Sequence, residues 1–187
     1  MTSTSVLVHG YPTGPLALPD ASDPHHAIWA LLESVCDPEI PVVSLREMGV
    51  LRAVQQGSDG LEVVITPTYS GCPAMDQMRD VVCNTLAQAG IQAKVVTQLA
   101  PAWSSDWITA QALDKLSAYG IAPPQRCAPV SNESVLQFAV RATPSAVACP
   151  QCQSINTTET SHFGSTACKA MYKCLDCSEP FDYFKPY

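Results

Sequence analysis

The stretch LEVVITPTYSGCPAM, residues 61–75, joins an apolar run to the beginning of a helical pattern. The run at 61–65 is rich in β-branched residues and predicts a strand. A helix is predicted after this strand, and Gly90 is placed to end it. Residues 91–99 predict another strand. The apolar residues of that helix recur at helical spacing, at Met75, Met78, Val82 and Leu86. Strand, helix and strand in this order predict a right-handed crossover between parallel strands.

The residues before this stretch predict a hairpin and a helix. Residues 50–54 read as a strand, and Gly57-Ser58-Asp59-Gly60 supplies the turn into the next strand. Asp23 and Pro24 predict a helix start, with Asp23 as the N-cap and Pro24 at the first helical position. We expect this helix to end before Pro38, because proline disfavours helical geometry in the preceding residue. Its apolar stripe lies at Ile28, Leu31, Leu32 and Val35.

The complete pattern predicts a small α/β (α+β) fold. A third helix, which Gly120 ends, is predicted from apolar residues at Ile108, Ala112, Leu113, Leu116 and Tyr119. The order helix, strand, strand, helix, strand, helix therefore predicts about three helices and a mixed sheet of three to four strands. A C-terminal cysteine-rich hairpin module, described below, completes the predicted fold.

We divide the chain into four segments. Residues 1–23 carry prolines, glycines and small polar residues without a period, and predict a flexible arm. Residues 24–124 form the α/β domain. Residues 125–148 are a linker, in which 135–140 predict an edge strand. Residues 149–187 are dense in cysteine and too short for an ordinary apolar core.

Composition argues against several classes of protein. The chain has 187 residues, a formal net charge of −7 and 14% charged residues. Such a charge argues against a duplex nucleic-acid binder, which needs a basic face. No apolar run approaches the ~18 residues of a membrane span, and residues 1–24 contain no Lys or Arg, so we expect neither a membrane helix nor a secretory signal. We expect a cytoplasmic protein, whose nine cysteines act as metal ligands or reactive thiols rather than disulfides.

Two Cys-x-x-Cys pairs carry the strongest chemical signal, and they are Cys149-Pro150-Gln151-Cys152 and Cys174-Leu175-Asp176-Cys177. Pairs ~20 residues apart are typical of a zinc ribbon, because each presents two thiolates to one tetrahedral ion. This structural zinc would also supply folding free energy that so short a segment lacks. Two redox pairs, four core cysteines or an Fe–S cluster are the alternatives, and Cys168 could replace one ligand.

The charge of the cysteine-rich segment indicates its kind of partner. Residues 142–187 contain three lysines and four acids. Four thiolates on one divalent zinc add further negative charge. We therefore expect contact with another protein, and no binding of nucleic acid.

Cys72 lies between the predicted strand at 61–65 and the helix that follows, where α/β proteins commonly bind ligands. Pro73 fits the first helical position, which makes Cys72 the predicted N-cap. Free N–H groups there would stabilise the thiolate and lower the pKa of Cys72. Such a thiolate is a metal or Fe–S ligand or a nucleophile. The alternative is that Cys72 is a small buried residue of the core.

Other polar and aromatic residues have simpler explanations. Asp37 and Glu39 could be ligands or partners of Cys72, but their turn, residues 37–41, explains them equally well. No set of acid–base or nucleophilic residues is complete, so we expect no enzymatic turnover. We predict packing roles for three cysteines and two tryptophans, at Cys36, Cys83, Cys127, Trp103 and Trp107.

Several of these segments resemble a known family. The turn at 37–41, the loop from Thr66 to Pro73 and the turn that holds Trp103 are similar to the SufT-like metal-sulfur cluster biosynthesis domain. The run FGSTACKAMYKC at 163–174, with EPFDYFK at 179–185, resembles the phenylacetate-degradation PaaD (PaaJ) family. The resemblance covers residues 24–187.

The SufT-like resemblance implies a role in Fe–S cluster assembly or delivery, with Cys72 as the hallmark cysteine. Asp37, Glu39 and Thr66 are further candidate residues from the matching turn and loop. That family usually has Asp-Leu-Gly after the second proline, whereas this chain has LREMG at 45–49. The helper role of an acid near Asp37 therefore falls to Glu47.

The PaaD resemblance implies a partner system. That family is encoded with the multicomponent phenylacetyl-CoA 1,2-epoxidase, which has a di-iron subunit and a reductase carrying flavin and a [2Fe–2S] cluster. We expect a non-enzymatic factor that matures a metal centre of this oxygenase, in particular in the reductase. Cys72 would be the soft ligand, and the ribbon would dock the client.

Two alternatives to this function stay open. One is a non-catalytic structural subunit of the oxygenase complex. The other is a zinc-ribbon nucleic-acid protein, which the charge opposes. Because one chain supplies only Cys72 as a carrier ligand, a transient Fe–S cluster would need a homodimer or a client cysteine.

Overall fold

The computed structural model describes residues 6–8, 11–69, 71–125 and 146–187. The chain packs as two compact units, residues 1–116 with Tyr187, and residues 117–186. The segment boundaries expected from the sequence stay predictions, and the edge strand at 135–140 lies outside the described residues. None of the described helices combines the length and the apolar character needed to cross a membrane.

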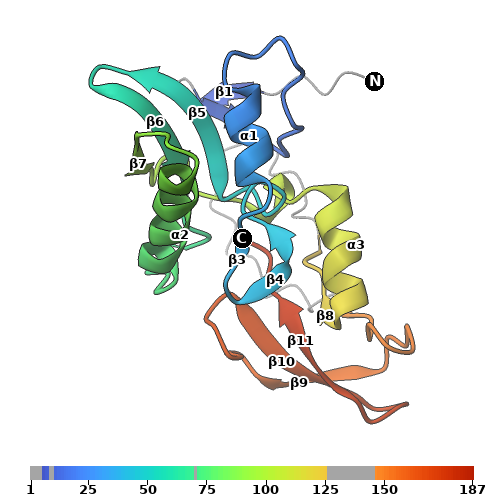
Figure 1. Cartoon of the computed structure of the whole chain (residues 1–187). Coiled ribbons are helices and arrows are strands. Elements are labelled where there is room, and N and C mark those ends of the chain that lie inside the picture. Colours follow the sequence, from blue (N-terminus) through green and yellow to red (C-terminus); the bar gives the residue numbers. More distant parts are fainter. Residues whose placement is uncertain (1–5, 9–10, 70, 126–145) are drawn as a thin grey trace, which may run out of the picture. The chain divides into compact units, whose positions relative to one another are not determined.

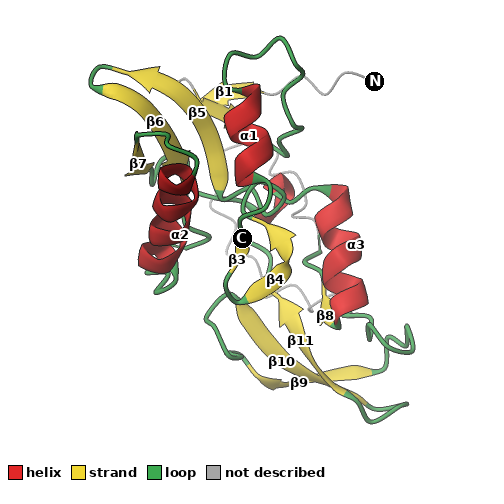
Figure 2. Cartoon of the chain, viewed as in Figure 1, coloured by secondary structure: helices red, strands yellow, loops and turns green. Residues whose placement is uncertain are grey.

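A three-stranded sheet forms the centre of the first unit (Figures 1 and 2). Strands β5 (Leu51–Gly57) and β6 (Gly60–Ile65) are antiparallel and form the predicted hairpin, in which Gly57 pairs with Gly60. Strand β7 (Ala93–Thr97) lies parallel to β6. Helix α2 (Met75–Gln88) connects these two strands, so the predicted parallel crossover is confirmed.

Helices α1 (His26–Leu32) and α2 contact each other, and α2 contacts β7 at the edge of this sheet (Figure 1). Gly90 follows α2 with φ 72°, in the left-handed region that favours glycine, and so ends the helix as predicted. The most deeply buried side chains of the unit include Leu32 of α1 and Leu86 of α2. Three successive residues of β6 are also buried, at Val63, Val64 and Ile65.

Helix α1 begins three residues after the predicted N-cap, so the cap assigned to Asp23 is wrong. Asp23 Oδ1 accepts a hydrogen bond from the N–H of His25 at 2.7 Å, and its main-chain oxygen accepts from His26. This side-chain bond closes a turn at Asp23, and the helix itself begins only at His26, with His25 as its N-cap. Helix α1 also ends at Leu32, earlier than Pro38 requires.

The first unit also contains short strands that the sequence pattern does not predict. Strands β1 (Val6–Val8) and β2 (Tyr11–Thr13) form an antiparallel pair within the segment expected to be a flexible arm. Strands β3 (Cys36–Asp37) and β4 (Ile40–Ser44) form a second antiparallel pair.

Gly49 lets the chain between β4 and β5 approach the short 3-10 helix η1 (Ser105–Trp107). Its φ of +75° lies in the left-handed region, and an added Cβ would sit 2.8 Å from the Cβ of Trp107. Only glycine therefore fits this position. Trp103 and Trp107 are both buried, as their predicted packing roles require.

Buried ion pairs hold the same part of the chain. Glu47 is 2% exposed, and both its carboxylate oxygens lie 2.8 Å from Nζ of Lys115 on α3 (Ala110–Tyr119). Its Oε2 also accepts from the N–H of Ser44 at 3.1 Å. Arg46 is buried beside it and pairs with Glu33, with Nη2 and Oε1 2.7 Å apart.

The second unit is a four-stranded sheet in the order β8-β11-β10-β9. Its strands are β8 (Ile121–Ala122), β9 (Thr157–Ser161), β10 (Lys169–Cys174) and β11 (Pro180–Phe184). Strand β10 is antiparallel to both its neighbours, and β8 lies parallel to β11. The predicted α+β class is confirmed, with three α-helices among the described residues and a cysteine-bearing C-terminal sheet.

We expect Lys115→Met to lower the free energy of unfolding by about 2 kcal/mol at pH 7, because Glu47 would keep a buried charge without its partner. Burial raises the pKa of Glu47, but the hydrogen bonds from Lys115 and Ser44 outweigh burial and hold the pKa below its usual value. This stabilisation is therefore present above about pH 4.5 and is lost as the pH falls and Glu47 is protonated.

Chemical denaturation at pH 7 and at about pH 3 measures this contribution. Lys94→Met, which removes an exposed lysine of β7, is the matched control and is expected to change stability little. An equal loss for Lys115→Met at both pH values, or no loss at pH 7, would contradict a stabilising Glu47–Lys115 pair.

Candidate metal centre and cysteine loop

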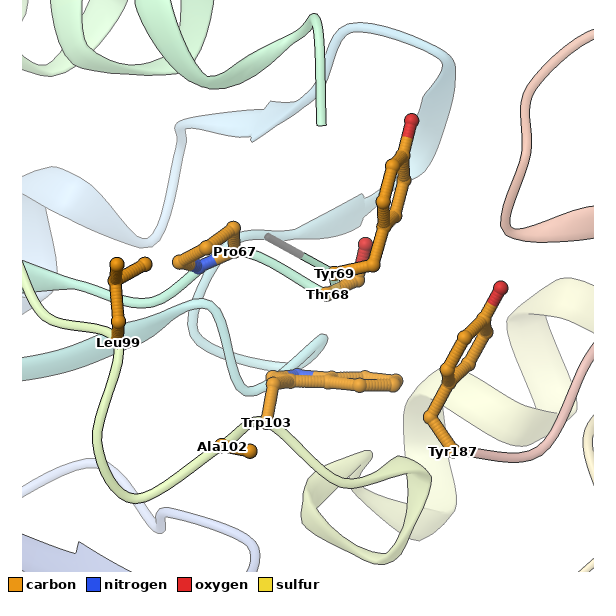
Figure 3. Close-up of a pocket in the computed structure, with 7 residues that line it drawn as sticks. All are labelled: Pro67, Thr68, Tyr69, Leu99, Ala102, Trp103 and Tyr187. Atoms are coloured by element: carbon orange, nitrogen blue, oxygen red, sulfur yellow. The ribbon is translucent and has the colours of Figure 1, made fainter. Parts of the chain in front are cut away.

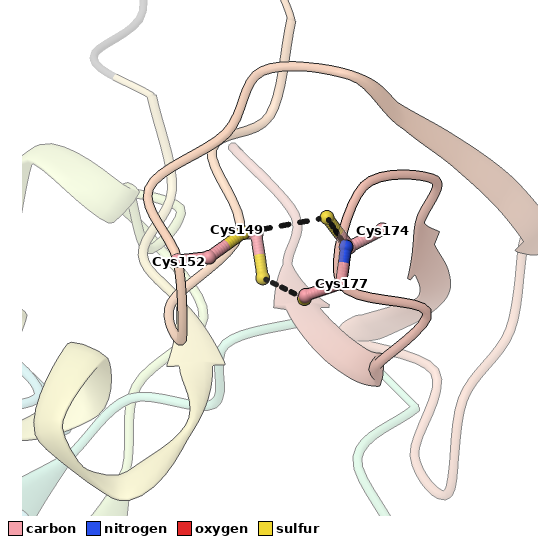
Figure 4. Close-up of side chains that lie close together, drawn as sticks. All are labelled: Cys149, Cys152, Cys174 and Cys177. Atoms are coloured by element: carbon pink, nitrogen blue, oxygen red, sulfur yellow. Dashed lines mark hydrogen bonds between the residues drawn. The ribbon is translucent and has the colours of Figure 1, made fainter.

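The four cysteines of the two Cys-x-x-Cys pairs meet in the second unit (Figure 4). Their sulfurs all lie within 4.8 Å of one another, with Cys149 and Cys177 3.8 Å apart and Cys152 and Cys174 3.5 Å apart. A tetrahedral zinc with Zn–S bonds of about 2.3 Å places its sulfurs about 3.8 Å apart. The donor set and its spacing therefore fit a structural zinc ion, with all four positions filled by protein.

The two pairs have the same local backbone. In each pair, the N–H of the first cysteine donates 2.9 Å to the carbonyl five residues later, Cys149 to Ser154 and Cys174 to Glu179. The residue after each second cysteine has a left-handed φ, 62° at Gln153 and 66° at Ser178. These turns aim both sulfurs of a pair to one side, which is what a shared ion needs.

Hydrogen bonds also join one turn to the other. Asp176, from the second turn, accepts from Ser154 Oγ and, at 2.7 Å, from Asn156 Nδ2. These two bonds lower the pKa of Asp176, so it stays ionised. The N–H of Leu175 donates to the carbonyl of Asn156 at 2.8 Å. The sulfur geometry is therefore held by the protein around it.

The thiols of the cysteine cluster differ in pKa. The N–H of Cys177 donates to Sγ of Cys174, 3.5 Å away, and such bonds lower the pKa of Cys174 to about 7. The N–H of Glu179 favours the Cys177 thiolate, but burial and the neighbouring cysteines raise the pKa of Cys177 to about 12. A divalent cation would offset the repulsion between neighbouring thiolates and allow all four cysteines to ionise.

Cys168 lies apart from this cluster. Its Sγ is 3.1 Å from Oγ1 of Thr166, and its carbonyl accepts from the N–H of Lys185. Among the described residues, the group of sulfurs that could hold one ion comprises Cys149, Cys152, Cys174 and Cys177.

Cys72 is half-buried in the loop between β6 and α2. The N-cap of α2 is Ala74, so the predicted cap position of Cys72 is wrong. The thiolate character expected of Cys72 stays a prediction. The backbone turns before the helix instead. The N–H of Cys72 donates to Tyr69 at 3.1 Å, and the carbonyl of Cys72 accepts from Met75 at 3.3 Å.

An aromatic cavity of about 360 Å³ lies against the residues that open the Cys72 loop (Figure 3). Trp103 lines it and donates from Nε1 to the carbonyl of Met48 at 3.1 Å. The ring of Tyr187 meets Trp103 edge-on, with centroids 6.3 Å apart. The other lining residues are Pro67, Thr68, Tyr69, Leu99 and Ala102.

Of the acidic candidates, Glu47 forms the ion pair with Lys115, whereas Asp37 and Glu39 lie in a turn. Asp37 is buried, and its Oδ1 accepts from the N–H of Glu39 at 2.8 Å, whereas the side chain of Glu39 is exposed. Thr66 is 2% exposed, and its N–H donates to Val50. A joint role of these residues with Cys72 stays a prediction.

Sequence reasoning missed the surroundings of Cys36. Burial raises the pKa of this half-buried thiol, Lys115 opposes the shift, and three acids reinforce it, Glu47, Glu33 and Asp37. The family resemblance suggests an acid that assists Cys72. In the structure, the thiol that Asp37 and Glu47 influence is Cys36. No spacing in the sequence signals this, because Lys115 is 68 residues from Glu47.

We expect the purified chain to hold one zinc ion, and Cys174→Ser to release it and unfold the second unit. Cys174 is fully buried, and metal binding and folding are coupled in so small a core. Elemental analysis and circular dichroism measure both effects. Cys168→Ser is the control and should retain zinc. Full zinc content in Cys174→Ser would contradict the assignment and point to Cys168.

Two family models match the chain. A model described as an iron-sulfur cluster assembly protein matches residues 25–97, which include Cys72. A model described as the PaaD zinc beta ribbon domain matches residues 135–185, which include the cysteine cluster. A domain of unknown function, DUF59, from Bacillus anthracis has a crystal structure with a TM-score of 0.45 and 25% identity, covering 49% of this chain and 90% of that one.

Two relatives extend this comparison. A protein named Fe-S protein maturation auxiliary factor, from Porphyromonas gingivalis, is 33% identical over 89 residues, 46% of this chain and 84% of its own length. A protein named as a putative subunit of 1,2-phenylacetyl-CoA epoxidase, from Escherichia coli, is 46% identical over 161 residues, 86% of this chain and 92% of its own length. This chain therefore belongs to the PaaD family, with an iron–sulfur cluster assembly domain followed by a zinc β-ribbon.

Proposed function

We propose that this protein is a non-enzymatic accessory factor that matures an Fe–S or other metal centre of the phenylacetyl-CoA epoxidase system. The observation that carries the proposal is the position of Cys72. It is half-buried in the loop that follows the buried strand β6, and the first residues of this loop line an aromatic cavity. The relative from Porphyromonas gingivalis is named a maturation factor and supports the activity. The relative from Escherichia coli is named an epoxidase subunit and supports the client system.

Cys72 is the proposed soft ligand for a cluster in transit. Thiolates hold Fe–S clusters, usually four to a cluster, so one Cys72 per chain needs further ligands. A second copy of this chain or a cysteine of the client would supply them. A shared, incomplete ligand set suits a carrier, because the cluster can leave when the client offers more thiolates. Asp37, Glu39, Thr66 and Glu47 are proposed helpers.

The zinc ribbon is proposed to dock the client, in particular the reductase. Its four cysteines leave no open position on the metal, so the ion is structural rather than catalytic. Two large apolar side chains next to the cysteine turns are exposed to solvent: Ile155 is 68% exposed and Leu175 is 54% exposed. Exposed apolar residues gathered at one end of a module favour contact with a protein. We place this encounter in the cytoplasm.

A structural subunit of the oxygenase complex is the second candidate. The relative from Escherichia coli favours it, because that protein is named as a subunit of the epoxidase itself. Stoichiometric co-purification of the chain with the active oxygenase would support this alternative, whereas a maturation factor is needed only in small amounts.

We expect Cys72→Ala to keep its fold and zinc content while the epoxidase reductase from the same cells loses its cluster by about tenfold or more. Removing one half-buried thiol from a loop leaves a small cavity at most. Even residues that only hydrogen-bond to a metal ligand typically contribute about 10- to 100-fold to metal affinity, and the ligand itself contributes more. Iron and labile sulfide per purified reductase measure the effect, together with growth on phenylacetate.

Cys83→Ala, which removes a half-buried thiol of α2, is the matched control and should leave the reductase loaded. If Cys72→Ala unfolds the protein, Cys72 is a packing residue. If it folds and the reductase is fully loaded, the carrier role is wrong and the structural-subunit alternative gains support.

A further inference from the structure

A second cavity, of about 300 Å³, lies in the second unit, and none of the four clustered cysteines lines it. Tyr172 of β10 and Tyr183 of β11 line it and are each 7% exposed. Glu159 of β9 lines it as well, together with His162 and Lys185, which follow β9 and β11. Because all three antiparallel strands contribute, the register of the sheet fixes the shape of this cavity.

The two tyrosine rings give the cavity an aromatic wall. Their centroids are 5.4 Å apart and their planes meet at 74°. Aromatic faces attract cations through the ring quadrupole, and they also pack the methylene stems of lysine and arginine. Burial and the nearby Glu159 raise the pKa of Tyr172 to about 12, so its hydroxyl stays neutral.

Glu159 brings a carboxylate to this wall. Its Oε2 accepts from the hydroxyl of Tyr172 at 3.3 Å, and its Oε1 lies 3.2 Å from Nδ1 of His162. Among the described residues, no lysine or arginine forms an ion pair with Glu159. Lys185 donates instead to the carbonyl of His162 at 3.1 Å, with Nζ 4.5 Å from the ring centroid of Phe163. The carboxylate therefore lacks a permanent cation.

We propose that this cavity binds a cationic side chain, arginine or lysine, of a partner protein. The charged end would meet Glu159, and the stem would lie along Tyr172 and Tyr183. The local charge favours a cation over an anion, because the described part of the second unit holds four acids against three lysines, and one of the acids, Glu159, lines the cavity. The inference rests on the client docking proposed above, but binding of a cation to the cavity does not require Cys72.

Nuclear magnetic resonance titration of the full, zinc-loaded chain tests this directly. The probes are N-acetyl-arginine amide and N-acetyl-lysine amide as cations, and phenylacetate as an anion. The cations should shift the resonances of Tyr172, Tyr183 and Glu159 saturably, with a Kd on the order of 1 mM for so small a probe. Glu159→Gln should weaken cation binding by about fivefold, with its zinc content unchanged.

Glu179→Gln is the matched control, because it removes the same charge from an exposed residue of the same unit outside the cavity. No saturable shift, a preference for phenylacetate, or equal weakening by both variants would overturn the proposal. Spermidine binding more than about tenfold tighter than either capped amino acid would assign the cavity to a free polyamine and also overturn it.

The same titration with Cys72→Ala separates this proposal from the carrier role. Cation binding should be unchanged in that variant. Loss of reductase loading with intact cation binding supports both proposals. Normal reductase loading with intact cation binding contradicts the carrier role alone, and absent cation binding contradicts the cavity alone.

Discussion

Burial of β6 on both faces is the constraint on which the first unit depends. Val63, Val64 and Ile65 are 0–1% exposed, and the strand is hydrogen-bonded to β5 on one edge and to β7 on the other. The chain then leaves the sheet at Thr66, which is itself buried and bonded to Val50. The loop that carries Cys72 and opens on the aromatic cavity therefore starts from a fixed point.

The second unit depends on a different interaction, the meeting of four cysteine sulfurs. Among its described residues, a buried cluster of eight includes Cys149 and Cys174 of the proposed metal site. A core this small gains little from apolar burial alone, so a metal that joins both turns would contribute directly to its folding. The same compact sheet also positions the tyrosines and Glu159 of the second cavity.

Much of this architecture follows from local sequence patterns. The hairpin at Gly57–Gly60, the parallel crossover and the helix end at Gly90 are set by residues close together in the chain, and so are the two cysteine turns. Contacts between distant residues leave no such signal. Lys115 neutralises Glu47 across 68 residues, and β8 extends the ribbon sheet by pairing with β11. The cap of α2 was misassigned because Pro73 fits a first helical position equally well in the turn that precedes the helix.

The central claim is that Cys72 carries a cluster to a client, and anaerobic reconstitution tests it most directly. The purified chain would be loaded with iron and sulfide and then mixed with apo-reductase of the epoxidase system. The account predicts a labile cluster that moves to the reductase, restoring its absorption spectrum, and no transfer from Cys72→Ala. A cluster that forms and transfers equally well without Cys72, or a chain that never acquires one, would contradict it.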